Sequence, residues 1–185
     1  NGALDDYNKA IELDPSDANF HFNRGLLKYD EIDDIHGAFI DFNKAVDIDQ
    51  KHANSYYFCG ILKYKKLNDI PGALSDFNQA IVIEPTNASF YHLRGMLKYE
   101  KLDDIAGALI DYNKSIELDR NNGDFYSNRA TLMCDLNNIS GAIQDFRQSA
   151  RLYQKQGRTE DFANAIALLK ELGANVSSAS FWMKK

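Results

Sequence analysis

The residues of this chain that could do chemistry are its histidines, its cysteines and its pairs of adjacent aspartates. Histidines that gather in one site can bind a metal ion or transfer protons, but the four here are irregularly spaced, at His21, His36, His52 and His92. The motifs GxxxxGKS/T, HExxH, GxSxG and GxGxxG, which mark phosphate-binding loops and catalytic sites, do not occur. The sequence therefore predicts a protein that is not an enzyme and has no catalytic, metal-binding or cofactor-binding residues.

The adjacent aspartates Asp33-Asp34 and Asp103-Asp104 could form carboxylate pairs for acid–base catalysis. Each pair also stands where a turn meets the start of a helix. An aspartate directly before a helix accepts hydrogen bonds from its free N–H groups, and its charge suits the positive end of the helix dipole. We interpret both pairs as a turn residue followed by a helix cap.

The cysteines and the net charge indicate in which compartment the protein works and which classes of partner it binds. Cys59 and Cys134 are far apart and no CxxC motif is present, so neither a disulfide framework nor a zinc site is indicated. This favours a reducing, cytoplasmic location. The formal net charge is −6, and no apolar run approaches the ~20 residues needed to span a bilayer. We expect no nucleic acid partner and no membrane insertion.

The elements that would position a site repeat along the chain. Short motifs recur in one register, 35 residues apart except at the last interval, which is 34. Gly-Ala occurs at 2–3, 37–38, 72–73, 107–108 and 141–142. Leu-Lys-Tyr occurs at 27–29, 62–64 and 97–99, and Asp-Phe-Asn or Asp-Tyr-Asn at 41–43, 76–78 and 111–113. Such a period indicates a repeat protein in which each unit is one small structural element.

Each repeat has the pattern of two helices joined by a short link, so neighbouring helices should be antiparallel. We expect first helices near 20–31, 55–66, 90–101 and 125–136, and second helices near 35–48, 70–83, 105–118 and 139–153. In the second helix Ala38, Phe42, Ala45 and Ile48 form one apolar stripe of helical period. Such stripes are buried when helix pairs stack side by side.

A column of small residues lies inside the first helices, at Gly25, Gly60, Gly95 and Ala130. Glycine in a helix costs about 1 kcal/mol relative to alanine, so its recurrence indicates a position where a larger side chain does not fit. Small residues recur early in the second helices as well, at Ala38, Ala73, Ala108 and Ala142. Together the two columns predict that the small residues of each helix pair approach each other closely.

These columns resemble the tetratricopeptide repeat (TPR). The repeat that begins at Ala53 supplies the small, aromatic and proline positions of that family with Gly60, Ala73, Phe77, Ala80 and Pro85. The resemblance implies an all-α fold, an α-α superhelix in which antiparallel helix pairs form a right-handed solenoid. We expect a single array with about four and a half units: a truncated unit at 1–14, full units at 18–52, 53–87, 88–122 and 123–156, a closing helix at 159–173 and a tail at 174–185.

Three further expectations concern the ends and the period of the array. Thr159 is the predicted cap of the closing helix. Because the chain begins with a second helix, we expect a fragment of a longer protein. The first three repeats exceed the 34 residues usual for the family, and we expect their extra residue in the turn between the helices, within DEIDDI, KKLNDI and EKLDDI. A period of 35 also occurs in RNA-binding pentatricopeptide repeats, but the small-residue columns and the negative charge favour the tetratricopeptide interpretation.

The resemblance implies that partners bind on a concave wall formed by the first helices. By position in the repeat, the binding face would consist of Phe22, Asn23, Leu26, Tyr29, Tyr57, Phe58, Ile61, Tyr64, His92, Met96, Tyr99 and Asn128. Its tyrosine column could instead pack between repeats, since an aromatic ring with a polar tip suits either role. The basic column of Arg24, Arg94 and Arg129 could pair with the aspartates of the second helices or face the groove.

The function implied by this resemblance is a non-catalytic scaffold for protein–protein interaction, without a cofactor. An apolar and aromatic face should bind an amphipathic helix or an extended peptide with bulky side chains. The alternative is a structural module that assembles into homo-oligomers through its first helix or through its C-terminal tail.

Overall fold

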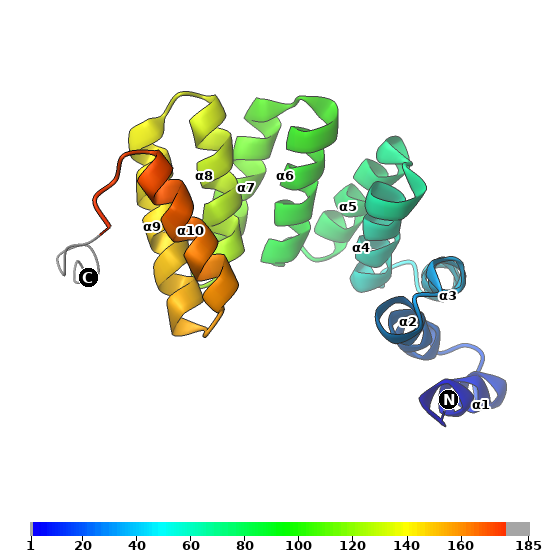
Figure 1. Cartoon of the computed structure of the whole chain (residues 1–185). Coiled ribbons are helices and arrows are strands. Elements are labelled where there is room, and N and C mark those ends of the chain that lie inside the picture. Colours follow the sequence, from blue (N-terminus) through cyan, green and yellow to red (C-terminus); the bar gives the residue numbers. More distant parts are fainter. Residues whose placement is uncertain (1, 177–185) are drawn as a thin grey trace. The chain divides into compact units, whose positions relative to one another are not determined.

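Within residues 2–176, which the computed structural model describes, the chain is built from helices alone. Their packing separates into two compact bodies, residues 2–97 and residues 98–176, and the boundary falls inside the helix α6 (Ala88–Leu102). We call these the first body and the second body. The predicted all-α class of paired helices is confirmed (Figure 1). None of the helices in this part of the chain combines the length and the apolar character that a membrane span requires.

The first body consists of helices that each pack against the next one along the chain. They are α1 (Gly2–Leu13), α2 (Ala18–Leu27), α3 (Ile35–Ile48), α4 (Ala53–Leu62), α5 (Ile70–Ile83) and the first part of α6. Each full helix pair is centred on one completely buried phenylalanine, Phe42 of α3 against Gly25 of α2, and Phe77 of α5 against Gly60 of α4. The apolar stripe of the second helices is therefore the core, as predicted.

The second body contains the rest of α6 together with α7 (Ile105–Leu118), α8 (Gly123–Asp135), α9 (Ile139–Lys155) and α10 (Thr159–Glu171). The helix α8 packs against both α7 and α9, and α10 packs against α9 (Figure 1). Ala165 and Leu169 of α10 are buried in this contact, as expected of a closing helix. The predicted cap Thr159 is instead the first residue of α10, and Arg158 precedes it without a capping side-chain bond. The predicted tail falls mostly on 177–185, outside the described residues.

The two kinds of helix agree with their predicted bounds to different degrees. The second helices α3, α5 and α7 span the predicted residues, and α9 runs on to Lys155. The first helices start earlier than predicted, at Ala18, Ala53, Ala88 and Gly123. They do so because a cap stands directly before them: the carboxylate of Asp17 accepts a hydrogen bond from the backbone N–H of Asn19, and Asn122 caps α8 in the same way.

The extra residue of the longer repeats lies in the last turn of the first helix, which corrects its predicted place in the link between helices. The helices α2 and α4 each continue into one wide π turn, Lys28–Ile32 and Lys63–Leu67. The N–H of Asp34 consequently reaches the carbonyl of Lys28, whereas Asn138 in the shorter repeat reaches Met133, one residue closer along the chain. In all four repeats the helix then ends on a left-handed residue, Asp33, Asn68, Asp103 or Asn137.

The glycine and the alanine of the Gly-Ala motif are required for different reasons. Gly37 lies where the carboxylate of Asp34 folds back to accept its N–H at 2.9 Å, and a Cβ at Gly37 would stand 2.0 Å from that carboxylate. Ala38 beside it is completely buried in the core. The interpretation of Asp33 and Asp34 as a turn residue and a cap is confirmed, and Asp69, Asp104 and Asn138 cap their helices in the same way.

The glycines inside the first helices make room for an aromatic ring, not for the alanine that we predicted opposite them. A Cβ at Gly25 would lie 2.7 Å from Cε1 of Phe42, and a Cβ at Gly60 would lie 2.7 Å from Cε1 of Phe77. Both distances are shorter than non-bonded carbon atoms tolerate. The residues of this column are small because the ring of the following helix occupies the space that their own side chains would need.

One helix cap should depend on pH. His52 caps α4 by accepting the N–H of Ser55 on Nδ1 at 3.2 Å, and burial lowers its pKa below the ordinary value of 6.5. Burial also lowers the pKa of His21. The unfolded chain therefore takes up protons more readily than the folded chain, and the free energy of unfolding should fall as the pH is lowered from about 7.5 to about 5.5. Urea unfolding at both pH values measures this.

The matched variant is His52→Asn, because asparagine already caps α8 at Asn122. It should keep the helix start and reduce the loss of stability at the lower pH. Identical losses in the variant and in the original chain would contradict a role of His52 in this pH dependence.

Candidate functional site

Some residues of the predicted binding face of the first body are buried in the core, and the others lie partly at the surface. Phe22, Ile61 and Tyr64 are buried and pack in the clusters around Phe42 and Phe77. The other predicted members in this body are half-buried: Asn23, Leu26, Tyr29, Tyr57, Phe58, His92 and Met96. We call this half-buried set the first-body face. The buried members can support it from below but offer little surface to a ligand.

The first-body face is organised around Phe58 of α4. Its ring centroid lies 5.7 Å from that of Phe22 and 5.3 Å from that of Phe42, both in the core. On the surface side it lies 6.3 Å from Tyr29, in the π turn that follows α2, and 5.4 Å from Tyr57. The rings meet tilted or edge to face, the arrangements that aromatic pairs favour. Because Phe58 contacts rings from α2, α3 and its own helix, it holds the half-exposed rings in fixed relative positions.

Tyr57 extends this run of rings to α6. Its ring lies 4.9 Å from Phe90 and 6.1 Å from Phe77. Burial raises the pKa of Tyr57 to about 12, so its hydroxyl stays protonated and keeps its O–H donor at neutral pH. Phe90 was not predicted as part of the site. Its column holds Phe20 and Phe125 in two other repeats and Ser55 in the repeat before it, so a recurring aromatic position did mark it in the sequence.

The second body holds the remaining predicted residues, Tyr99 on α6 and Asn128 on α8, both half-buried. The hydroxyl of Tyr99 donates a hydrogen bond to the carboxylate of Asp135, and this bond raises the pKa of Tyr99 to about 12. On α8 the small polar residues Ser127 and Thr131 stand in the columns of Tyr57 and Ile61. Where the first body carries the rings of Tyr57 and Phe58, the second body therefore carries the polar residues Ser127 and Asn128.

The basic columns pair with aspartates of the second helices, which decides between the two roles open to them. The guanidinium of Arg24 contacts both carboxylate oxygens of Asp41, at 2.6 and 2.9 Å, and Nζ of Lys28 lies 2.8 Å from the same carboxylate. The guanidinium of Arg129 likewise donates to both carboxylate oxygens of Asp145, at 2.6 and 2.8 Å. These cations are engaged in holding helix pairs together.

The arginines also tie successive repeats to each other. The remaining guanidinium N–H of Arg24 donates to Asn8 on the preceding second helix at 2.8 Å. Two more such bonds join Arg94 to Asn78 and Arg129 to Asn113. Each arginine thus bridges its own repeat to the one before.

The second repeat breaks this pattern, because Cys59 occupies the position of the arginine. Its aspartate, Asp76, pairs with Lys63 at 2.7 Å, and burial raises the pKa of Asp76. Burial acts on Asp41 too, but there the hydrogen bonds from Arg24 and Lys28 outweigh it and the pKa is lowered. Because no arginine bridges α4 to α3, the packing of these two helices depends on the rings around Phe58.

The histidines and cysteines stay apart. His21 is buried with Nδ1 3.8 Å from Asp41, and His52 caps a helix. Cys59 is buried and Cys134 half-buried, both as free thiols, and the cytoplasmic location inferred from them stays a prediction. Among residues 2–176, no group of three or more histidine, cysteine or acidic side chains could hold a metal ion.

Two family models match the sequence. One, described as TPR repeat, matches residues 1–30, and the other, described as tetratricopeptide repeat, matches residues 88–122. The chain contains tetratricopeptide repeats. The second match covers the same residues as the third full unit predicted from the period of this TPR chain. A sequence search of curated proteins found no match.

Solved structures share the fold of this TPR chain. A crystal structure of MamA is 19% identical with a TM-score of 0.71 and covers 84% of this chain and 89% of its own. YrrB, described as a TPR protein with an unusual peptide-binding site, is 17% identical with a TM-score of 0.67, over 96% of this chain and 95% of its own. A thermophilic TPR protein of Thermus thermophilus is 14% identical with a TM-score of 0.70, over 89% of both chains. At these identities the likeness concerns the fold, so the ligand has to be inferred from this chain's own surface.

Proposed function

We propose that this TPR chain is a non-catalytic scaffold that binds a peptide or a partner helix on its first-body face. The observation that supports this proposal is the run of half-exposed rings formed by Tyr29, Phe58 and Tyr57. Rings that a packed core already holds in place offer a large contact area at little further cost in conformational entropy. YrrB, which has the same fold, is described as carrying a peptide-binding site.

The surroundings of these rings define the chemistry of the ligand. Exposed Asn19 and Asn54 and half-buried Asn23 stand on the same helices and can hydrogen-bond to a peptide backbone. The nearby cations Arg24 and Lys28 are already paired with Asp41, so they are not expected to bind ligand carboxylates. The ligand should be an amphipathic helix or an extended segment with bulky apolar side chains.

Substitution of Phe58 tests this proposal. A peptide is selected by phage display on the chain, and its affinity is measured by calorimetry for the original chain and for Phe58→Asn. Asparagine is the residue of this column in two other repeats, Asn23 and Asn128, so a helix of this type accommodates it. We expect binding to weaken at least about tenfold, because the ligand loses a contact worth about 1.4 kcal/mol or more.

Two further variants keep the result unambiguous. Tyr29→Asn removes a ring at the edge of the face without opening the core and should weaken binding in the same direction. Val82→Lys alters an exposed position of α5 outside the face, where the side chain is 75% exposed, and should leave the affinity unchanged. A selected peptide that binds all four proteins equally would remove the first-body face as the site.

A further inference from the structure

The surroundings of Arg129 show how this chain holds a planar, positively charged group. The carboxylate of Asp145 on α9 accepts two of the guanidinium N–H groups, at 2.6 and 2.8 Å. The amide oxygen of Asn113 on α7 accepts a third at 2.7 Å. The ring centroid of Tyr126 lies 5.9 Å from the guanidinium carbon, which is within the range of a cation–π contact. A carboxylate, an amide oxygen and an aromatic ring thus surround one guanidinium group.

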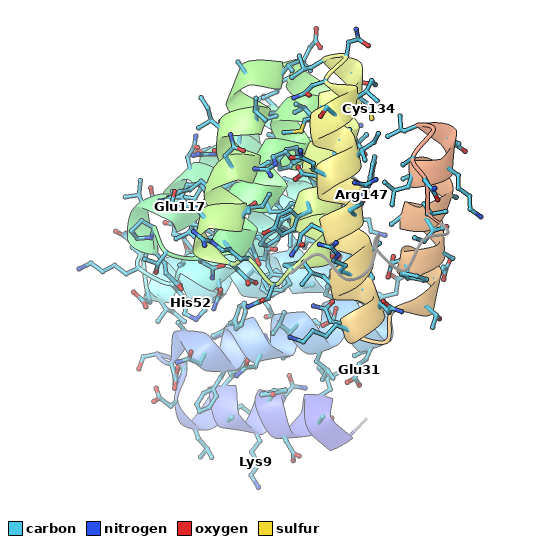
Figure 2. All side chains as sticks on the ribbon, turned by 90° about the vertical axis from the view of Figure 1, so that its left-hand side faces the viewer. Lys9, Glu31, His52, Glu117, Cys134 and Arg147 are labelled. Atoms are coloured by element: carbon cyan, nitrogen blue, oxygen red, sulfur yellow. The ribbon has the colours of Figure 1, made fainter. Side chains whose placement is uncertain are left out.

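The second repeat keeps these three partners but lacks the arginine. Asp76 on α5, Asn43 on α3 and Tyr56 on α4 stand in the columns of the carboxylate, the amide and the ring. The arginine position is taken by Cys59, whose side chain ends well before the point where an arginine carries its guanidinium. Figure 2 labels His52, the cap that precedes α4, and this helix carries both the ring and the cysteine.

The carboxylate of Asp76 lacks a partner that the carboxylate of Asp41 has. Arg24 and Lys28 both contact Asp41, and its side chain is 1% exposed. Among the described residues the cationic partner of Asp76 is Lys63 alone, and the side chain of Asp76 is 12% exposed. Lys63 lies 2.7 Å from Oδ2 but outside hydrogen-bond geometry, so this buried oxygen accepts no hydrogen bond from a described residue. Asp41 shows that a carboxylate in this column can hold a lysine and a guanidinium together.

The amide and the ring of the second repeat are also available to a ligand. Nδ2 of Asn43 donates to the carbonyl of Phe39 at 2.7 Å, and no described residue donates to Oδ1. The same amide oxygen accepts an arginine N–H in the other members of this column, Asn8, Asn78 and Asn113. The ring of Tyr56 is half-buried, and the negative charges of Asp47 and Asp76 act on its hydroxyl. A cation at this place would therefore meet an acceptor, a ring and a negative field.

We propose that the second repeat binds a guanidinium group from a partner protein, in the place that an arginine side chain of the chain itself fills in the other repeats. The N–H groups of the ligand donate to Asp76 and Asn43, and its plane lies against Tyr56. An arginine side chain within a polypeptide is favoured over free arginine, because the α-carboxylate of the free amino acid would be repelled by the exposed Asp47 and Asp49. None of these residues belongs to the first-body face.

The test uses N-acetyl-arginine methylamide, a probe that carries a guanidinium and no other charge. Its binding to the isotopically labelled chain is followed by NMR, through the backbone amide signals of Asn43, Tyr56 and Asp76. We expect saturable shifts with a Kd on the order of 1 mM, as befits a ligand of this size. The citrulline analogue has the same shape without the charge, and the lysine analogue has the charge without the planar fork. Both should bind at least about fivefold more weakly.

Cys59→Arg is the most informative variant, because the new side chain fills the site from within. Arginine is the residue of this column in the three other full repeats, so a helix of this type accommodates it. The variant should lose detectable binding of the probe and should unfold at a higher temperature than the original chain. Cys59→Ala keeps a small, uncharged side chain and should bind as the original chain does. Asp76→Asn should weaken binding at least about tenfold.

The outcomes separate this proposal from the proposed function. Phe58→Asn should leave the affinity for the arginine probe unchanged, since Phe58 belongs to the first-body face. Absence of saturable shifts, equal binding of the three probes, or undiminished binding by Cys59→Arg would each overturn the site. If Cys59→Arg does not fold, Asp76→Asn decides by itself. Free arginine that binds more tightly than the capped probe would overturn the partner protein as the source and indicate a free small molecule.

Discussion

Replacing Phe77 by alanine is expected to lower the free energy of unfolding of this TPR chain by about 4 kcal/mol. The ring is completely buried and packs with Ala73, Leu93 and Leu97 in one cluster. Its removal leaves a cavity between helices that are already in contact and can close only partly. Urea denaturation measures the loss. Val82→Ala, at an exposed position of the same helix, is the control and should change the value by less than about 0.5 kcal/mol.

A second substitution tests whether the ring and Gly60 compete for one space. Gly60→Leu alone should destabilise by about 1–3 kcal/mol, because its Cβ would already lie 2.7 Å from the ring of Phe77. In the double variant Gly60→Leu, Phe77→Ala the leucine can enter the vacated volume. The combined loss should therefore be smaller than the sum of the two single losses. Simple additivity would show that this contact does not explain the glycine column.

The bounds of the second helices could be predicted because their starts carry explicit signals. An Asp or Asn cap, a glycine that admits its folded-back side chain and a buried alanine occur at fixed intervals, as in Asp34, Gly37 and Ala38. The π turns could not be predicted, since DEI and KKL share little beyond the final aliphatic residue. An extra residue forms a π turn where the backbone hydrogen bonds can shift their register at the least cost in free energy. The pattern of side chains along the sequence does not indicate where that is.

The candidate face could be predicted as a set of positions but not as a surface. One tyrosine column has three different outcomes: Tyr29 is half-buried on the first-body face, Tyr64 is buried in the core, and Tyr99 is bonded to Asp135. The same residue type at the same position behaves differently because its neighbours differ from repeat to repeat. Only the contacts of each repeat decide how much of a ring remains for a ligand.

Replacing Asp41 by asparagine is expected to cost about 3 kcal/mol of stability at neutral pH. The carboxylate is 1% exposed and holds Arg24 and Lys28, whose side chains are each 18% exposed. Asparagine has a similar shape but carries no charge, so both cations stay largely buried without a counter-charge. Breaking a buried ion pair on one side costs about 3–5 kcal/mol, and we expect the lower end because long basic side chains can turn partly towards water.

The same substitution one repeat later isolates the contribution of the arginine. Asp76 stands in the same column but faces Cys59 in place of an arginine, and burial raises its pKa, so its charged form is less well supported. Asp76→Asn should therefore change the stability little at neutral pH, by less than about 1 kcal/mol in either direction. Equal losses at the two positions would contradict this difference.

The pH dependence of the two aspartates should have opposite signs. The pKa of Asp41 lies below the ordinary value for aspartate of about 3.9, so its contribution to stability is present above that pH and is lost as the pH falls through the lower, folded pKa. The pKa of Asp76 is raised, so folding favours its protonated form and its charged form weighs against stability above the raised pKa. Lowering the pH from about 7 to about 3 should shrink the difference between the original chain and Asp41→Asn. The difference for Asp76→Asn should change in the opposite sense over the same range, and urea denaturation at both pH values measures the two trends.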